Sequence, residues 1–233
     1  MILQEIFRRL ALTKLSNLAD SEGSDIAQED KEKILVHING ALLQLYTDFV
    51  LSKKTVMLAL QEGMVEYTIS GEFAVSSEDI HSNGPFYILD TEEEPFKNDL
   101  IQILSVYDDT GREHSIDNKT EWNSIYRPAY NKVVIPYDCA EQRLFSFGYQ
   151  ARYPEVTLDK AADNIPIPHS LEEALLSYIA YGVYKDMNTA ESVGSAQGHL
   201  LDYERLTGKA EAKNLAGESL SDTGNKFSNK GFV

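Results

Sequence analysis

Residues 164–215 read NIPIPHSLEEALLSYIAYGVYKDMNTAESVGSAQGHLLDYERLTGKAEAKNL and hold the strongest structural signal in the chain. Pro168 ends an extended run, and Ser170 and Glu173 have the spacing of a capping box, so a helix should begin here. Apolar side chains from Leu171 to Val183 then fall on more than one face of that helix. We expect it to be covered on several sides, by its own chain or by a neighbouring copy.

A last helix is expected over residues 191–215, with a narrow apolar seam suited to packing on one partner. Its seam positions alternate in steps of three and four: Val193, Ala196, Leu200, Tyr203, Thr207 and Ala210. From these two helices we expect the following side chains to pack between subunits: Leu176, Ala180, Tyr184, Leu200 and Tyr203.

The first 52 residues also have helical periodicity, over residues 2–18 and about 26–51. Strand-like runs follow. KTVMLAL and VEYTI flank Gln61-Glu62-Gly63 and predict a hairpin, and DLIQILSVYD turns at Asp109-Thr110-Gly111. LFSFGYQARY alternates apolar and polar residues, as expected of a strand with one buried face. FYIL (86–89) is a further short strand-like run, and the rest of residues 74–98, together with residues 116–131, fits neither pattern and is expected to form long loops.

The order of these elements predicts an α+β protein. Helix pairs from the two ends, residues 1–52 and 164–215, should form one four-helix bundle, because neither pair can bury its apolar faces alone. An antiparallel β domain, residues 53–163, is inserted between them, and residues 216–233 form an extended, flexible tail.

Composition excludes several classes of function. A net charge of −16 argues against affinity for nucleic acid through a basic face. Cys139 is the single cysteine, so a disulfide within the chain and a thiolate zinc site are both excluded. The N-terminus lacks the pattern of a signal peptide, and no run reaches the roughly eighteen apolar residues of a membrane span. We expect a soluble protein without a membrane partner.

Catalytic patterns are absent or weak. The five histidines do not have metal-ligand spacing, and neither a phosphate-binding glycine loop nor a nucleophile elbow occurs. The acidic run Asp90–Glu94, with Asp108 and Asp109, could bind a divalent ion, but a solvated loop is the favoured interpretation. We therefore predict no catalytic residue, no cofactor and no metal.

The C-terminal segment has two interpretations. It is rich in Gly, Ser and Asn, which is typical of a frayed end. Alternatively, Phe227 and Phe232, flanked by Lys226 and Lys230, are anchors that dock on a partner.

The order of these segments resembles the head-to-tail adaptor (connector) proteins of tailed phages, in particular short-tailed phages. The likeness runs from about residue 2 to 215 and depends on four segments taken together. These are the N-terminal helix pair ending in YTDFVL, the stretch KTVMLALQEGMVEYTI, the strands DLIQILSVYDDTGREHSI, VVIPY and FSFGYQARYP, and the IPIPHSLEEALLSYIAYGVYKDM helix with AQGHLLDYERLTGKAEA.

The resemblance implies a structural virion protein without catalytic activity. About twelve copies would form a ring between the portal and the tail, with the helices around the DNA channel and the β section toward the tail nozzle or tube protein. DNA would be enclosed without sequence-specific binding. The C-terminal segment would grip the portal, which makes Lys226, Phe227, Lys230 and Phe232 the expected docking residues.

Two other functions stay open at this point. One is a small oligomeric scaffold or interaction protein unrelated to phages. The other is a divalent-metal hydrolase that uses the Asp90–Glu94 run.

Overall fold

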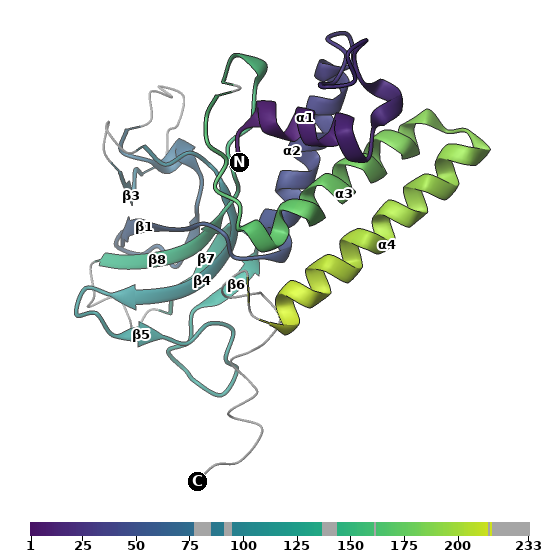
Figure 1. Ribbon diagram of the computed structural model, residues 1–233. Coiled ribbons are helices and arrows are strands. Elements are labelled where there is room, and N and C mark those ends of the chain that lie inside the picture. The colour runs from purple at the N-terminus through teal and green to yellow at the C-terminus, as the bar shows by residue number, and fades with distance from the viewer. Residues whose placement is uncertain (77–84, 91–94, 137–143, 161, 214, 216–233) are drawn as a thin grey trace. The chain divides into compact units, whose positions relative to one another are not determined.

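The computed structural model is an α+β protein made of two compact units (Figure 1). The structure describes residues 1–76, 85–90, 95–136, 144–160, 162–213 and 215. One unit joins the two ends of the chain, residues 1–51 and 153 onward, and we call it the helical unit. The other, residues 52–152, is the strand unit.

The helical unit contains four α-helices within the described residues. They span Leu3–Thr13 (α1), Lys31–Asp48 (α2), His169–Met187 (α3) and Ala190–Ala212 (α4). In the part of the chain that the structure describes, short 3₁₀ turns occur at Ser16–Leu18, Gly71–Phe73 and Leu158–Lys160.

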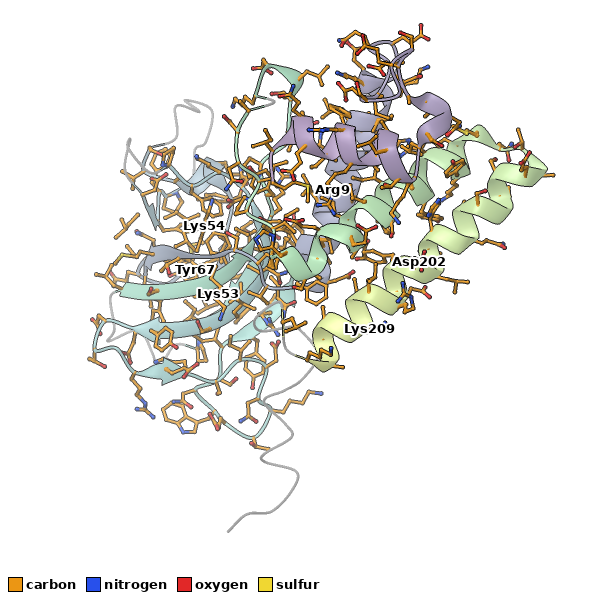
Figure 2. All side chains as sticks on the ribbon, viewed as in Figure 1. Arg9, Lys53, Lys54, Tyr67, Asp202 and Lys209 are labelled. Carbon is orange, nitrogen blue, oxygen red and sulfur yellow. The ribbon has the colours of Figure 1, made fainter. Side chains whose placement is uncertain are left out.

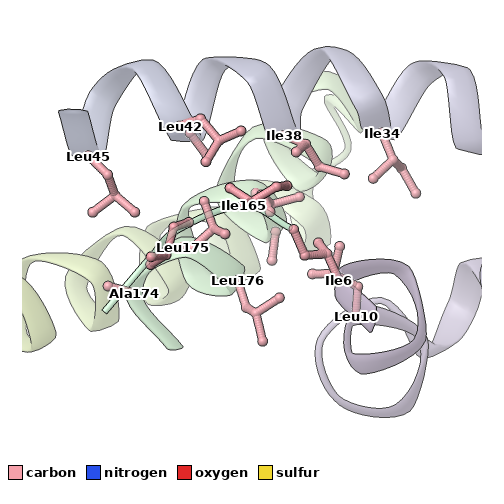
Figure 3. Packing of buried hydrophobic residues seen from close by; sticks show 14 of the residues in the cluster. Ile6, Leu10, Ile34, Ile38, Leu42, Leu45, Ile165, Ala174, Leu175 and Leu176 are labelled. Carbon is pink, nitrogen blue, oxygen red and sulfur yellow. The ribbon is translucent and has the colours of Figure 1, made fainter. Parts of the chain in front are cut away.

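Helix α3 is the centre of the helical unit, because α1, α2 and α4 all contact it. Figure 3 shows side chains of the three helices α1, α2 and α3 that belong to one core cluster: Ile6, Leu10, Ile38, Leu42, Leu175 and Leu176. The several apolar faces of α3 are therefore covered by helices of the same chain. No neighbouring copy is needed to bury them.

The capping box expected at the start of α3 is wrong. Pro168 is the N-cap and has no side-chain hydrogen bond to the helix. Glu173 instead pairs with Arg9 and Lys14, with N–O distances of 3.2 and 3.3 Å, so two cations from α1 and its C-terminal end hold its carboxylate. A capping box does occur in α4, where Thr189 accepts from the backbone N–H of Ser192.

The strand unit contains two antiparallel sheets. Their strands are Lys53–Ala59 (β1), Glu66–Thr68 (β2), Ile88–Leu89 (β3), Leu100–Asp108 (β4), Glu113–His114 (β5), Tyr126–Ala129 (β6), Lys132–Val134 (β7) and Leu144–Ala151 (β8). The larger sheet has the order β3-β1-β8-β4-β5, and the smaller one β2-β7-β6. Side chains of both sheets meet in one core, for example Tyr67 of β2 and Phe147 of β8.

The predicted hairpin around Gln61-Glu62-Gly63 is wrong. β1 pairs with β3 and β8, whereas β2 pairs with β7 in the other sheet. The turn is real, with Gly63 at a φ of 77°, but it carries the chain between sheets. Tyr67 closes this turn, because its hydroxyl accepts from the N–H of Gln61 and donates to the carbonyl of Met64.

The other strand predictions are largely confirmed. β4 and β5 form the expected hairpin, in which Val106 faces His114. In β8 the side chains of Phe145, Phe147 and Tyr149 are buried on alternate positions. Gln150 breaks the pattern because it is also fully buried. The strand expected at residues 86–89 is confirmed in part, since β3 covers its second half, whereas the segment 116–131, expected to be a long loop, contains the short strand β6.

The β section ends earlier than the predicted boundary at residue 163. Residues from Tyr153 onward belong to the helical unit. There the Asn39 side chain of α2 bonds both backbone groups of Val156, and the N–H of Ile165 donates to the carbonyl of Met1. These bonds attach the returning chain to the helices.

Candidate interaction surface

The structure changes the expected roles of the subunit-packing residues. Leu176 and Ala180 are fully buried and Tyr203 is 5 % exposed, all within the core of one chain. Packing between copies through these three is therefore corrected to packing inside a single chain. Tyr184 and Leu200 keep intermediate exposure, and the Tyr184 hydroxyl donates to the carbonyl of Lys14 at 3.0 Å.

Tyr203 connects α4 to α2 through a partly buried hydrogen bond. Its hydroxyl donates to the carboxylate of Asp48, which also accepts from Gln44 at 2.9 Å. Its ring lies 4.8 Å from that of Tyr178 of α3. Burial, and then the bond to the Asp48 carboxylate, raise the pKa of Tyr203 above its usual value, so the hydroxyl remains a donor.

Five large apolar side chains are exposed on the described helices of the helical unit. They are Leu12 (57 % exposed), Val36 (70 %), Leu43 (50 %), Val193 (43 %) and Leu201 (65 %). Val193 was expected in the apolar seam of α4, so its exposure corrects that expectation, and the helical periodicity gives no signal for the other exposed side chains. One pattern in the sequence does indicate that Leu201 is exposed: it is an apolar residue among glycines on the side of α4 opposite its apolar seam.

A half-open pocket of about 430 Å³ lies between α2 and the C-terminal end of α3. His37 lies at this pocket, with Nε2 3.3 Å from the Asp186 carboxylate. Burial lowers the pKa of His37, and the charge of Asp186 opposes this shift. Gly182 permits the packing, because a Cβ there would lie 2.6 Å from Nδ1 of His37.

Among the described residues of the strand unit, the carboxylates of Asp99 and Asp108 are buried, and both are held by neighbouring groups of the same unit. Asp108 accepts from Thr110 and the N–H of Arg112, and Nε2 of His114 lies 3.1 Å from its other oxygen. The hydrogen bond from Thr110, followed by those from Arg112 and His114, outweighs desolvation and lowers the pKa of Asp108 to about 2. Asp99 accepts from Tyr149 and from Lys54, a residue labelled in Figure 2. Both carboxylates are therefore buried and hydrogen-bonded within the strand unit.

The acidic run is represented in the described residues by Asp90 alone. The Asp90 carboxylate accepts hydrogen bonds from Ser76 and from the backbone N–H of Phe96. It therefore links a residue on the N-terminal side of Asp90 to one on its C-terminal side. Among the residues that the structure describes, no group of three His, Cys, Asp or Glu side chains could hold a metal ion. The rest of the run lies outside them.

The predicted portal-docking residues also lie outside the described residues, as does Cys139. The last described position, Leu215, accepts a hydrogen bond from Ser170 of α3 at 3.4 Å. The tail is therefore attached to a chain end that is held near the beginning of α3.

Within the described part of the chain, none of the helices is long and apolar enough to cross a membrane. Neither the comparison with protein-family models nor the comparison with curated proteins found a match.

Proposed function

We propose that this protein is a structural adaptor of a tailed-phage virion, which forms a ring of about twelve copies between the portal and the tail. The observation that supports it best is the arrangement of the chain: strand unit 52–152 interrupts a helical unit built from both ends. That is the order that the resemblance to head-to-tail adaptors implies. In this proposal the helical unit is the four-helix bundle and the strand unit is the inserted domain.

The chemistry of the described residues favours binding over catalysis. The two buried carboxylates described above, those of Asp99 and Asp108, already accept hydrogen bonds from neighbouring side chains. Large apolar side chains are exposed on both units, for example Leu201 (65 % exposed) on the helical unit and Trp122 (72 %) on the strand unit, and a protein partner can cover them. The charge of −16 is also suited to a channel through which DNA passes without adhering.

In the proposed ring the helices surround the DNA channel, the strand unit contacts the tail nozzle or tube protein, and residues 216–233 bind the portal. The docking residues are Lys226, Phe227, Lys230 and Phe232. Aromatic anchors on a Gly- and Ser-rich segment are a common way for a terminal segment to bind a preformed ring.

The test is co-expression with the portal protein from the same genome, followed by size-exclusion chromatography and electron microscopy. We expect the full chain to co-elute with the portal and to add a ring beneath it. A variant that ends at Leu215 should keep its fold, measured by circular dichroism, and lose co-elution. A Phe227→Ala/Phe232→Ala variant should weaken it, whereas Leu220→Ala in the same segment should not.

Two results would contradict the proposal. One is a chain that never associates with the portal, which would favour an oligomeric scaffold of another kind. The other is an unchanged association after removal of residues 216–233, which would remove the docking role of the tail. Turnover of a phosphate ester in the presence of Mg²⁺ would favour the hydrolase instead.

A further inference from the structure

Helix α4 has an outer face that nothing in the described chain covers. With about 100° of rotation per residue, Gly194, Gly198, Leu201, Arg205 and Gly208 lie along one line of the helix. This line is opposite the side chains that α4 buries against α3. Leu201 is 65 % exposed in the middle of it. The exposed Leu201 side chain thus lies between glycines, which have no side chain to cover the helix backbone.

The three glycines on this line are not explained by the fold of a single chain. A Cβ added at Gly194, Gly198 or Gly208 would meet nothing within 4 Å. Glycine also has a lower helix propensity than alanine. Glycine is useful on a helix surface where a second helix approaches closely, because the missing side chain leaves room for a side chain of the other helix.

Charged residues on the flank of this face indicate which helix fits it. Glu191 and Lys209 are both exposed and lie on the same flank of α4. Within the described residues, neither has an ion-pair partner. They lie on opposite sides of the midpoint between Gly198 and Leu201, each about nine residues away. A two-fold axis through that midpoint would place Glu191 of one copy beside Lys209 of the other.

We propose that two copies of this chain associate through α4 in an antiparallel, two-fold symmetric contact. Leu201 of each copy occupies the gap over Gly198 of the other, and two Glu191–Lys209 pairs lie at the ends of the contact. The contact is isologous, so each complementary feature occurs twice. This inference does not depend on the proposed adaptor function.

The outer face of α2 is a poorer partner for this surface. It presents Val36 and Leu43, so its apolar spacing is similar. In the antiparallel alignment that sets Gly40 against Leu201, however, Lys33 of α2 lies on the same flank as Lys209 and already pairs with Asp30 of its own chain at 3.2 Å, so it offers Lys209 no opposite charge. The α4–α4 pairing brings opposite charges together at those positions.

The contact is expected to be weak. A single helix pair with exposed ion pairs is at the small end of specific interfaces, and salt screens such pairs. The experiment is therefore sedimentation equilibrium of the purified full chain over a wide range of concentrations, up to about millimolar. We expect reversible dimers whose dissociation constant rises with salt.

Substitutions locate the surface. Leu201→Glu should raise the dissociation constant of the dimer at least about tenfold. Leu43→Glu is the matched control, because Leu43 is an exposed leucine of another helix in the same unit, and it should leave the constant unchanged. Circular dichroism melting checks that both variants are folded.

A mixing experiment tests the symmetry. Glu191→Lys and Lys209→Glu should each weaken self-association, because each places like charges together twice. An equimolar mixture of the two variants should form a heterodimer more stable than either homodimer, because every pair is then complementary.

A wild-type chain that stays monomeric over the whole range would overturn the proposal. So would equal effects of Leu201→Glu and Leu43→Glu, or a mixture no more associated than its components. None of these outcomes bears on the portal-binding test. Dimers without portal binding would contradict only the adaptor function, and portal binding by a chain without dimers would contradict only this inference.

Discussion

At the residue scale, the contact between Gly182 and His37 shows that helical periodicity does not predict which residues of two helices pack closely. Gly182 lies within a strongly apolar helix, where alanine has the higher helical propensity. Its role becomes apparent only when α2 is placed beside α3, because His37 occupies the volume that a Cβ would need.

We predict that Gly182→Ala destabilises the helical unit by about 2 kcal/mol, since either His37 or the helix backbone must move. Gly194→Ala is the matched control: it meets open space, so it should stabilise the protein by up to about 1 kcal/mol. Chemical denaturation of dilute protein measures both. Equal effects would show that the close approach is not important.

The lowered pKa values of two histidines predict how the stability of the fold depends on pH. Burial lowers the pKa of His37, and burial followed by the charge of Lys14 lowers that of His199. Because both folded pKa values lie below the unfolded value of 6.5, the unfolded chain binds more protons as the pH falls through that value. Stability should therefore be full above about pH 7 and decrease toward about pH 5.5.

The measurement is the free energy of unfolding from urea titrations across that range. The double variant His37→Gln/His199→Gln should have a flatter profile than the wild type. A double variant with an unchanged slope would assign the effect to other groups.

At the element scale, the N-terminal caps of the helices were poorly predicted from the sequence. The Ser170–Glu173 pattern resembled a capping box, but Glu173 binds Arg9 and Lys14, more than 150 residues earlier in the chain. The real box, Thr189 with Ser192, has serine where glutamate is usual and was missed. The β1–β2 hairpin failed for a related reason: the turn residues were correct, but the strands pair with β8 and β7.

We predict that Thr189→Ala destabilises α4 by about 1 kcal/mol, because the N–H of Ser192 loses its acceptor. Ser195→Ala is the control within the same helix, since its hydroxyl only donates to a carbonyl of its own helix and is exposed. It should have little effect. Thermal melting followed by far-ultraviolet circular dichroism distinguishes the two variants, and equal losses would exclude a capping role.

At the scale of the whole molecule, the chain has two separate cores. One cluster contains Leu175 and the other side chains between the helices, and the other contains Phe147 and the side chains between the sheets. Because each unit buries its own apolar surface, each can unfold with its own cooperativity.

We predict two unfolding transitions that respond to different substitutions. Leu175→Ala should reduce the free energy of unfolding of the helical unit by about 2–5 kcal/mol. Phe147→Ala should reduce the free energy of unfolding of the strand unit by about 3–5 kcal/mol. Calorimetry combined with far-ultraviolet circular dichroism follows both. A single transition that shifts equally in both variants would show that the units unfold together.

The amino-acid pattern was sufficient for the α+β class, the existence of the long helices, the alternation in β8 and the β4–β5 hairpin. These features depend on local periodicity and on turn residues a few positions apart. Only the tertiary structure decided that the several apolar faces of α3 are covered by its own chain, that β1 and β2 belong to different sheets, and that Leu201 stays exposed. The physical reason is that burial depends on what approaches a surface from distant parts of the chain, and a helical pattern has the same period whichever partner covers it.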